Sequence, residues 1–342
     1  MNKMHLKIFS IFMFLSLASL TLHAALSKDQ ALKQENQKIL DISERMTHFY
    51  DLKNNEDIKD ITEQVLESPD TKPDVKEEIK AYHRRIYLFR YPSDGLSIKG
   101  FVSLPAGPAC HPLLVLFRWG NRNFALFNPG LDMANYRDYA VISSTLRGGV
   151  SEGQDEFGGT DIDDMKNLIA FYPQLANKLH ACPRPTHLYM LGPSRGGLEM
   201  FLMLARYPQL QNKVEKIVAL SSILDLHRQI TDREDMKTMF MHDFGLSADN
   251  AETWIKQRDP LETVPYLRKS LPILIIQGTK DQRVDLEEGH HMVEKLQEHG
   301  NPVTYWELEG GNHTLRNIPH LMDDIGHWLE SPLPHSPPDH AR

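Results

Sequence analysis

The sequence predicts an α/β protein built on a mostly parallel sheet of eight strands, with helices on both faces. From Tyr82 onward, short apolar runs of strand length recur, and helical segments separate most of them. Short buried strands that alternate with helices are typical of parallel sheets covered on both sides. The region opens on a hairpin, so its first two strands are expected to be antiparallel.

The strands are predicted in chain order from their apolar runs. "RRIYLFRYP" and "SIKGFVSLP" flank the turn Ser93-Asp94-Gly95, which is a hairpin signal. The six later strands are expected in "PLLVLFRW", "YAVISST", "THLYML", "KIVALSS", "LPILIIQG" and "VTYWELE". The main helices between them are expected in "DIDDMKNLIAFYPQLANKL", "GGLEMFLMLARYP" and "DLEEGHHMVEKLQEHG".

The N-terminus has the layout of a secretory signal peptide over residues 1–24. Two lysines precede an apolar run from Ile8 to Leu22, and the small residues Ala24 and Ala25 follow. This run is short for a membrane span, which needs about 20 apolar residues. We therefore expect cleavage after Ala24 or Ala25, no stable membrane anchor, and a secreted or periplasmic mature protein.

Three further segments differ in composition from the strand-and-helix region. Residues 25–80 are polar and nearly free of glycine, and are expected to form a helical lead-in packed on the domain that follows. Residues 223–271, between the sixth and seventh strands, are long and rich in Met, His and Asp, and are expected to form a partial cap over the site. Residues 331–342 are Pro-rich and expected to be disordered.

Composition excludes several functions. The chain of 342 residues has a formal net charge of -8 and no Lys/Arg-rich run, which argues against a nucleic-acid surface. No Cys/His spacing is typical of zinc and no Gly-rich phosphate loop is present, so no metal and no cofactor is expected. The partner is expected to be a small-molecule or short-peptide substrate, and the sequence leaves the oligomeric state open.

Two stretches match Gly-x-Ser-x-Gly, the signature of a serine nucleophile on a strand-to-helix turn. "GGVSEGQ" places Ser151 in a loop rich in Gly and acidic residues, with no helix for about ten residues. "LGPSRGG" places Ser194 between a buried strand and an immediate helix. Ser194 is therefore the predicted nucleophile, and the backbone N–H of Arg195 is expected to point at a developing oxyanion.

The partners of such a serine follow in the order acid, then histidine. Asp281 follows the strand "LPILIIQG", and His313 follows "VTYWELE". Each lies just past the carboxyl end of its strand, where sites form in open α/β sheets. His313 is expected to take the proton of Ser194 and Asp281 to orient His313. Asp285 is the alternative acid.

With these residues the chain resembles the α/β-hydrolase superfamily, and most of all the catalytic domain of the prolyl oligopeptidase family of serine peptidases. The matching pieces are "GPSRGG", "PILIIQGTKDQRV", "GGNHT" and the Arg-Gly loop "LRGGVSEG". The resemblance implies an α/β-hydrolase catalytic domain over residues 81–330. It also implies Ser194 as nucleophile, His313 as base and Asp281 as the residue that orients it.

The sequence departs from that family in two places. Where relatives carry His-Gly-Gly or Tyr-Gly-Gly, this chain reads "FRWGNRNF", so the second oxyanion donor is expected from the indole or backbone N–H of Trp119, or from Gly120. The family's peptidases usually carry an N-terminal β-propeller, and none is expected before Tyr82. This second departure weakens the peptidase interpretation and strengthens the esterase one.

Arg118, Arg122 and Arg195 are candidates for binding a substrate carboxylate at the mouth of the pocket. The alternative is that they point to solvent or pair with local acids such as Glu199. The sequence alone leaves both possibilities open.

The family's sheet order makes the strands after Cys110 and Cys182 parallel neighbours. Both cysteines would then lie at one edge of the sheet, opposite the active site, and a disulfide is expected between them in an oxidising compartment. The alternative is two free buried thiols.

These features together predict a serine hydrolase that acts through an acyl-Ser194 intermediate. A serine-type peptidase on short peptides is the first hypothesis, and a carboxylesterase on small esters is the alternative. A non-catalytic binding protein with the hydrolase fold is a remote third, which the complete triad argues against.

Overall fold

The computed structural model describes residues 30–133 and 138–332. The predicted signal peptide and the tail beyond residue 332 lie outside the described residues. Within the described ranges, no helix is long and apolar enough to cross a membrane.

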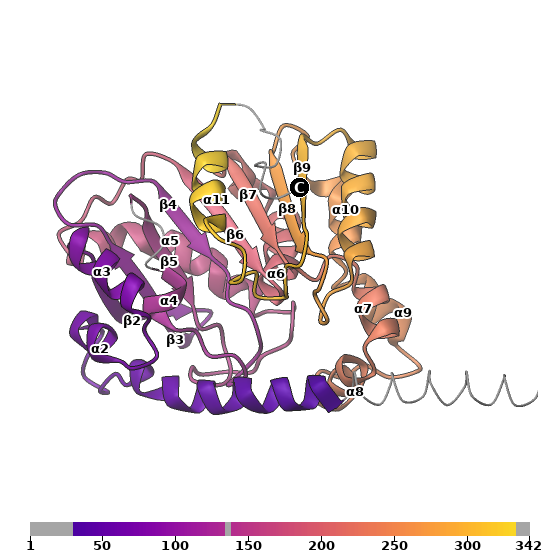
Figure 1. Ribbon diagram of the computed structural model, residues 1–342, viewed down its shortest axis with the longest axis horizontal. Coiled ribbons are helices and arrows are strands. Elements are labelled where there is room, and N and C mark those ends of the chain that lie inside the picture. The colour runs from indigo at the N-terminus through magenta and orange to yellow at the C-terminus, as the bar shows by residue number, and fades with distance from the viewer. Residues whose placement is uncertain (1–29, 134–137, 333–342) are drawn as a thin grey trace, which may run out of the picture.

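A single sheet forms the centre of the described structure, with nine strands in the order β1-β2-β3-β5-β4-β6-β7-β8-β9 (Figure 1). The pairs β1–β2, β2–β3 and β3–β5 are antiparallel, and the remaining pairs are parallel. The predicted mostly parallel α/β sheet is confirmed. The strands are β1 (Ile58–Asp60), β2 (Arg85–Ser93), β3 (Leu96–Leu104), β4 (Leu113–Leu116), β5 (Ala140–Ser144), β6 (Leu188–Pro193), β7 (Lys216–Leu220), β8 (Ile273–Gly278) and β9 (Val303–Leu308).

The eight predicted strands are all present, and β1 is an additional one. It pairs with β2 at the edge of the sheet. The predicted β2–β3 hairpin closes through Asp94 and Gly95, which both have positive φ, 50° and 84°. Two successive residues of this kind form the tight turn that matches the twist of paired strands.

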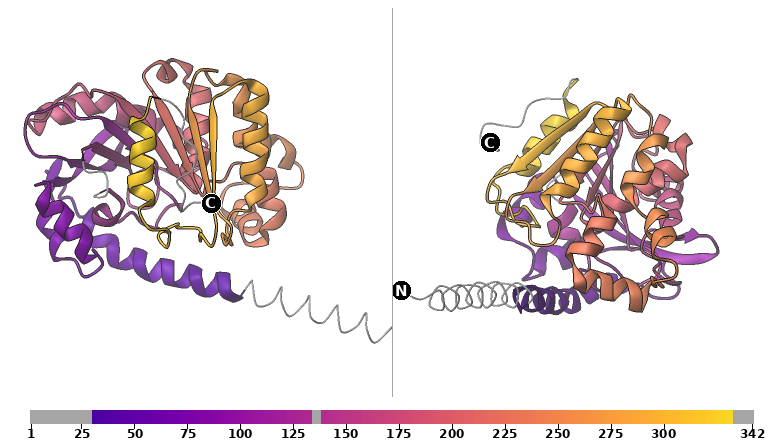
Figure 2. Two further views of the ribbon diagram at one scale, coloured as in Figure 1. Left: turned by 45° about the horizontal axis from the view of Figure 1, so that its top comes forward. Right: turned by 90° about the vertical axis from the view of Figure 1, so that its right-hand side faces the viewer.

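Helices cover both faces of the sheet (Figure 2). Alternate residues of one strand serve the two faces, because strand side chains point to opposite sides. In β4, Leu113 and Val115 join the core with α5, α6 and α10, whereas Leu114 and Leu116 join the core with α11. The helices are α2 (Thr62–Glu67), α3 (Pro73–Ala81), α4 (Pro129–Met133), α5 (Ile162–Lys178), α6 (Arg195–Arg206), α7 (Leu226–Asp232), α8 (Glu234–Asp243), α9 (Ala251–Lys256), α10 (Leu286–His299) and α11 (Leu321–Glu330), with 3-10 turns η1 (Thr47–Tyr50), η2 (Pro208–Asn212) and η3 (Pro260–Tyr266).

Residues 30–46 are helical and run along the edge of the sheet at which β6, β8 and β9 end (Figures 1 and 2). The inward positions of this helix are Leu32, Asn36, Ile39, Ser43 and Met46, spaced three or four residues apart as an amphipathic helix requires. Met46 is fully buried and belongs to the same hydrophobic core as the buried side chains of α11. Residues 30–46 thus pack on the sheet domain, and the region before residue 81 also contributes β1.

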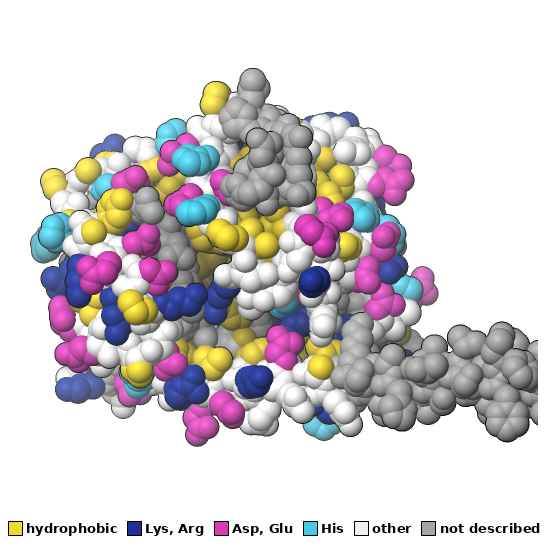
Figure 3. All heavy atoms as spheres, viewed as in Figure 1, with side chains coloured by type: hydrophobic (Ala, Val, Ile, Leu, Met, Phe, Trp, Pro, Cys, Tyr) yellow, Lys and Arg dark blue, Asp and Glu magenta, His cyan; other side chains and the backbone are white. Residues whose placement is uncertain are grey.

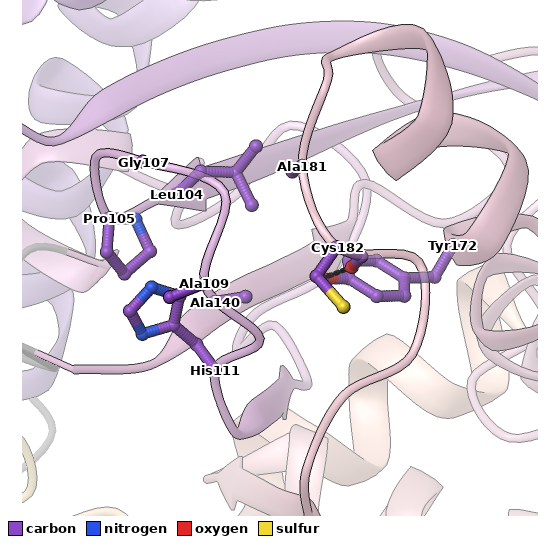
Figure 4. Close-up of a pocket in the computed structure, with 9 residues that line it drawn as sticks. All are labelled: Leu104, Pro105, Gly107, Ala109, His111, Ala140, Tyr172, Ala181 and Cys182. Atoms are coloured by element: carbon purple, nitrogen blue, oxygen red, sulfur yellow. Dashed lines mark hydrogen bonds between the residues drawn. The ribbon is translucent and has the colours of Figure 1, made fainter.

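Cys110 and Cys182 form a disulfide. They lie in the loops before β4 and β6, which are parallel neighbours. The predicted pairing is therefore confirmed, and the bond lies at the edge of the sheet opposite the ends of β6, β8 and β9. A shallow pocket beside it is lined by residues such as Leu104, His111 and Tyr172 (Figure 4).

Candidate active site

Ser194 stands at the apex of a sharp turn between β6 and α6. Its backbone has φ 52° and ψ -122°, a strained conformation for a residue with a side chain. The backbone around it is held from both sides: the Ser194 N–H donates to the Leu220 carbonyl, and its own carbonyl accepts from Ile223 and Gly197. Such a turn exposes the serine hydroxyl at the carboxyl edge of the sheet.

The glycines of "LGPSRGG" are required by close packing at this turn. A Cβ on Gly192 would lie 2.5 Å from the Gly196 carbonyl oxygen, and one on Gly197 would lie 2.2 Å from the Ser222 hydroxyl. A Cβ on Gly196 would lie 2.9 Å from the Phe117 Cβ. The turn can therefore form only where these three positions lack side chains.

The structure brings Ser194, His313 and Asp281 together. The His313 Nε2 atom lies 3.1 Å from the Ser194 hydroxyl oxygen, and the His313 Nδ1 atom lies 2.8 Å from Asp281 Oδ2. Because the carboxylate can only accept, Nδ1 carries the proton and Nε2 is free to accept the proton of Ser194. This is the geometry of a serine nucleophile with its base and orienting acid.

Asp281 is held rigidly by its own loop. Its Oδ1 accepts from the backbone N–H groups of Arg283 at 2.8 Å and Val284 at 3.1 Å. The Asp281 side chain is only 2% exposed and that of His313 is 17% exposed. The acid is therefore buried beneath a histidine that remains accessible to substrate.

The acid loop and the histidine loop pack directly against each other. The Lys280 N–H donates to the Gly311 carbonyl, and the Gly310 N–H donates to the Thr279 hydroxyl. A Cβ on Gly278 would lie 2.2 Å from the Gly311 oxygen. Glycine at these positions lets the ends of β8 and β9 approach closely enough for the Asp281–His313 bond.

The competing serine and the competing acid have structural roles. The Ser151 hydroxyl accepts from the Lys99 N–H at 2.8 Å and pairs with the Thr145 hydroxyl at 2.6 Å. Asp285 caps α10 by accepting from the Glu287 N–H at 2.9 Å. Neither side chain takes part in the hydrogen bonds that join Ser194, His313 and Asp281.

The three arginine candidates do not form a carboxylate clamp, which corrects that part of the sequence prediction. Arg118 is buried, and its guanidinium donates to the backbone carbonyls of Trp119, Arg122, Phe124 and Thr145. It braces the loop after β4 from within and is not available to substrate.

Arg195 and Arg122 are likewise occupied. The Arg195 guanidinium is buried against Asp155, Asp161 and Glu199, so the pairing with Glu199 that the sequence left open is the observed one. Arg122 pairs with Asp243 of α8 at 3.4 Å. A substrate carboxylate would have to displace that partner.

The predicted oxyanion donors lie on two segments that contact each other. The Arg195 backbone N–H is in the first turn of α6, where such groups lack partners within the helix. The Trp119 carbonyl accepts from Arg118 Nε at 3.0 Å, so the Gly120 N–H of the same trans peptide points the opposite way. The choice between Trp119 and Gly120 as second donor stays a prediction.

Charge is concentrated beneath the nucleophile. Burial raises the pKa of the Glu199 carboxyl well above its usual value, and burial also raises the pKa of Asp161. Burial acts on Asp155 too, but the Arg195 guanidinium holds the pKa of that carboxyl below its usual value. The sequence analysis missed Asp155 and Asp161, for which the only signal was the acid-rich run "GQDEFGGTD".

Arg283 is a third residue near the site that was not predicted from the sequence. Its carbonyl accepts from Gln229 and Arg233 of the region predicted as a partial cap. Its guanidinium bonds Asn36 at 2.6 Å and pairs with Glu35 at 3.3 Å, both in the helix of residues 30–46. Arg283 thus joins the loop of Asp281 to both of these segments.

Within residues 30–133 and 138–332, no group of His, Cys, Asp and Glu side chains is arranged to hold a metal ion.

Comparison with known families agrees with this geometry. Residues 127–335, more than half of the chain, match the model of the prolyl oligopeptidase family. The chain belongs to the prolyl oligopeptidase family. It is thus a serine hydrolase of a peptidase family, with the α/β-hydrolase fold that the sequence predicted.

Relatives of known sequence carry peptidase names. The chain is 25% identical over 254 residues to the uncharacterized peptidase YtmA of Bacillus subtilis, covering 73% of this chain and 95% of that protein. It is 27% identical over 240 residues to dipeptidyl peptidase family member 6 of Caenorhabditis elegans, covering 66% of this chain but 31% of that protein.

Solved structures share the fold. A puromycin-hydrolyzing peptidase of Mycobacterium tuberculosis superposes with a TM-score of 0.58 at 17% identity, covering 75% of this chain and 41% of that one. The chain therefore spans nearly all of the Bacillus relative and less than half of the nematode and mycobacterial proteins.

Proposed function

We propose that this protein is a serine peptidase that cleaves short peptides through an acyl-enzyme on Ser194. The observation that carries the proposal is the unbroken chain of hydrogen bonds from the Ser194 hydroxyl through His313 to Asp281. Membership of a peptidase family and peptidase-named relatives support the choice of an amide substrate.

The first half of the reaction follows from this geometry. The Ser194 oxygen attacks the scissile carbonyl carbon while His313 Nε2 takes the hydroxyl proton. Asp281 stabilises the imidazolium through Nδ1 and stays ionised. The oxyanion of the tetrahedral intermediate is stabilised by the Arg195 N–H and by a donor from Trp119 or Gly120.

The second half releases the two products in turn. His313 gives its proton to the leaving amine, and the C–N bond breaks to leave the acyl group on Ser194. Water then attacks the ester carbonyl while His313 takes its proton, the acyl C–O bond to Ser194 breaks as His313 returns that proton to the Ser194 oxygen, and the carboxylic acid leaves. An ester substrate would follow the same steps with an alcohol as leaving group.

The surroundings of the triad support short substrates. The helix of residues 30–46 is anchored at one side to the segment after β4, where the Leu126 N–H donates to the Ser43 hydroxyl at 3.1 Å. It is anchored at the other side to Arg283, two residues after Asp281. The molecular surface is hollowed above this helix, with hydrophobic and basic side chains along the rim (Figure 3). A site bounded in this way favours a peptide end over a folded chain.

We also propose that the mature protein is secreted or periplasmic. The signal-like N-terminus and the Cys110–Cys182 disulfide both support an oxidising compartment.

The test compares an aminoacyl p-nitroanilide with the matching p-nitrophenyl ester. Wild-type protein is expected to cleave both, and Ser194→Ala to lower amide turnover by roughly three to six orders of magnitude. Ser151→Ala is the matched control and is expected to keep its activity. Cleavage of the ester alone would make the protein an esterase, and activity that survives Ser194→Ala would contradict the mechanism.

A further inference from the structure

The Arg195 side chain is the most heavily bonded group beneath the site. Its Nε donates to Glu199 at 2.6 Å, and its two terminal nitrogens donate to the two oxygens of Asp155 at 2.6 and 2.7 Å. One terminal nitrogen also donates to Asp161 at 2.5 Å and the other to the Gly120 carbonyl at 3.2 Å. All five N–H groups of the guanidinium therefore have acceptors.

This cluster is not explained by stability alone. Arg195 is 1% exposed, and three carboxylates surround one cation with the Phe157 ring 4.4 Å from the guanidinium carbon. Burying ions is costly, and well-packed apolar residues often serve a fold equally well in place of a buried ion pair. A cluster of this kind is better explained by the backbone conformation that it imposes on a neighbouring segment of the chain.

Two of its bonds reach the segment after β4 that is expected to supply the second oxyanion donor. Arg195 holds the Gly120 carbonyl directly. Asp155 holds the Arg122 N–H at 3.0 Å through the same oxygen that Arg195 contacts. The peptide groups on both sides of Asn121 are thus anchored to the ion pair.

That segment needs an external anchor. Gly120 and Arg122 both have positive φ, 67° and 45°, and Arg122 has a side chain that makes this conformation strained. Strained backbone persists only where the surroundings hold it. Arg195, the residue directly after the nucleophile, anchors this backbone through the Gly120 carbonyl, and its partner Asp155 anchors it through the Arg122 N–H.

We propose that Arg195 and Asp155 are positioning residues for the oxyanion site. The backbone N–H of Arg195 is one donor, and its own side chain, with Asp155, sets where the segment of Trp119 and Gly120 lies relative to that donor. The inference rests on the proposed function, since it assigns a role within the same acyl transfer. It follows that the ion pair acts on the transition state, in which the oxyanion exists, and not on substrate binding.

The principal variants are Asp155→Asn and Arg195→Lys, with Arg195→Met as the apolar replacement. Removing one oxyanion donor costs about 100- to 1000-fold in kcat, so displacing a donor is expected to cost about 10- to 100-fold. KM is expected to stay within about threefold, as a loss confined to the transition state requires. Arg195→Lys, which keeps the charge, is expected to recover part of the activity that Arg195→Met loses.

The affinity for a peptide boronic acid separates the two roles, because a purely structural role would leave this affinity unchanged. The boronic acid forms a tetrahedral adduct on the serine, so its affinity is expected to fall by the same factor as kcat, whereas the affinity of the peptide product is expected to stay unchanged. Rates are divided by the concentration of sites that react with a fluorophosphonate. This correction keeps the comparison valid for variants that fold only in part.

Asp164→Asn is the matched control. Asp164 forms a similarly buried pair with Arg147 at 2.8 Å but lies outside the Arg195 cluster. It is expected to lower the melting temperature with little change in kcat. Where Asp155→Asn does not fold, Arg195→Lys decides the question.

The inference is overturned if Asp155→Asn and Arg195→Lys behave like the control, with lower melting temperatures but unchanged kcat and boronate affinity. Failure of the wild-type protein to react with the fluorophosphonate at Ser194 would instead count against the proposed function. The two failures are therefore distinguishable.

Discussion

Asp281 is distinguished from neighbouring acids by its backbone contacts. Two N–H groups of its own loop hold Oδ1, so that Oδ2 faces His313 Nδ1 at 2.8 Å. Asp285 is only four residues further along, yet its carboxylate is committed to the start of α10. The geometry therefore favours Asp281 over Asp285 for the proposed orienting role.

Replacing Asp281 with Asn is expected to lower kcat by about four orders of magnitude, because an amide no longer fixes the productive tautomer of His313. Asp285→Asn is the control and is expected to keep kcat within a few-fold. Steady-state kinetics on the p-nitroanilide measure both. Equal losses in the two variants would show that the acid has been misassigned.

At the residue scale, the sequence predicts the triad better than its surroundings. Ser194, Asp281 and His313 each follow an apolar strand, and the carboxyl ends of parallel strands meet at one edge. The partners of Arg118 and Arg195 could not be predicted, because a buried arginine is satisfied by whichever acids and carbonyls tertiary packing brings near it.

At the scale of elements, the helix of residues 30–46 is the segment that we propose limits the length of the substrate. Glu35 and Asn36 bond the guanidinium of Arg283, next to the acid loop. Their simultaneous replacement with Ala removes one hydrogen bond to a charged group, worth about 1.5–3 kcal/mol, and one partly exposed ion pair, worth about 0–1 kcal/mol. Without these contacts to Arg283, the helix is expected to be bound less tightly beside the hollow described above.

This double variant is expected to raise kcat/KM for longer peptides relative to dipeptide substrates. A series of peptides of increasing length measures the ratio. Gln37→Ala is the control, because Gln37 is exposed and bonds Asp41 of the same helix. An unchanged ratio in the double variant would show that the helix does not limit substrate length.

Prediction of elements succeeded where apolar runs were long and failed where they were short. The central strands β4 to β8 carry the continuous apolar runs that a parallel sheet buries, whereas β2 and β9 alternate buried with less buried positions. β1 has only three residues, Ile58–Asp60, in a polar stretch, and exists because it pairs with the exposed edge of β2. Such a strand depends on its partner and leaves no periodic signal in the sequence.

At the scale of the whole molecule, the disulfide and the active site lie at opposite edges of the sheet. Cys110 and Cys182 are 72 residues apart in sequence, and closing a loop of that length is worth about 4 kcal/mol in the chain-entropy model. The bond is therefore expected to act on stability and not on catalysis.

Replacing both cysteines with Ser is expected to lower the melting temperature by roughly 8–16 °C, using about 2–4 °C per kcal/mol for domains of this size. kcat/KM at 25 °C is expected to remain within about twofold of the wild-type value. Calorimetry and steady-state assays measure the two quantities. A loss of activity at an unchanged melting temperature would contradict this separation.

The central claim, that Ser194 forms the acyl-enzyme, is tested most directly by covalent labelling. The protein is treated with a fluorophosphonate, digested and mapped by mass spectrometry. The account predicts one adduct on the peptide that contains Ser194, present in wild-type protein and in Ser151→Ala, and absent in Ser194→Ala. An adduct on the peptide that contains Ser151, or no adduct on the active wild-type protein, would contradict it.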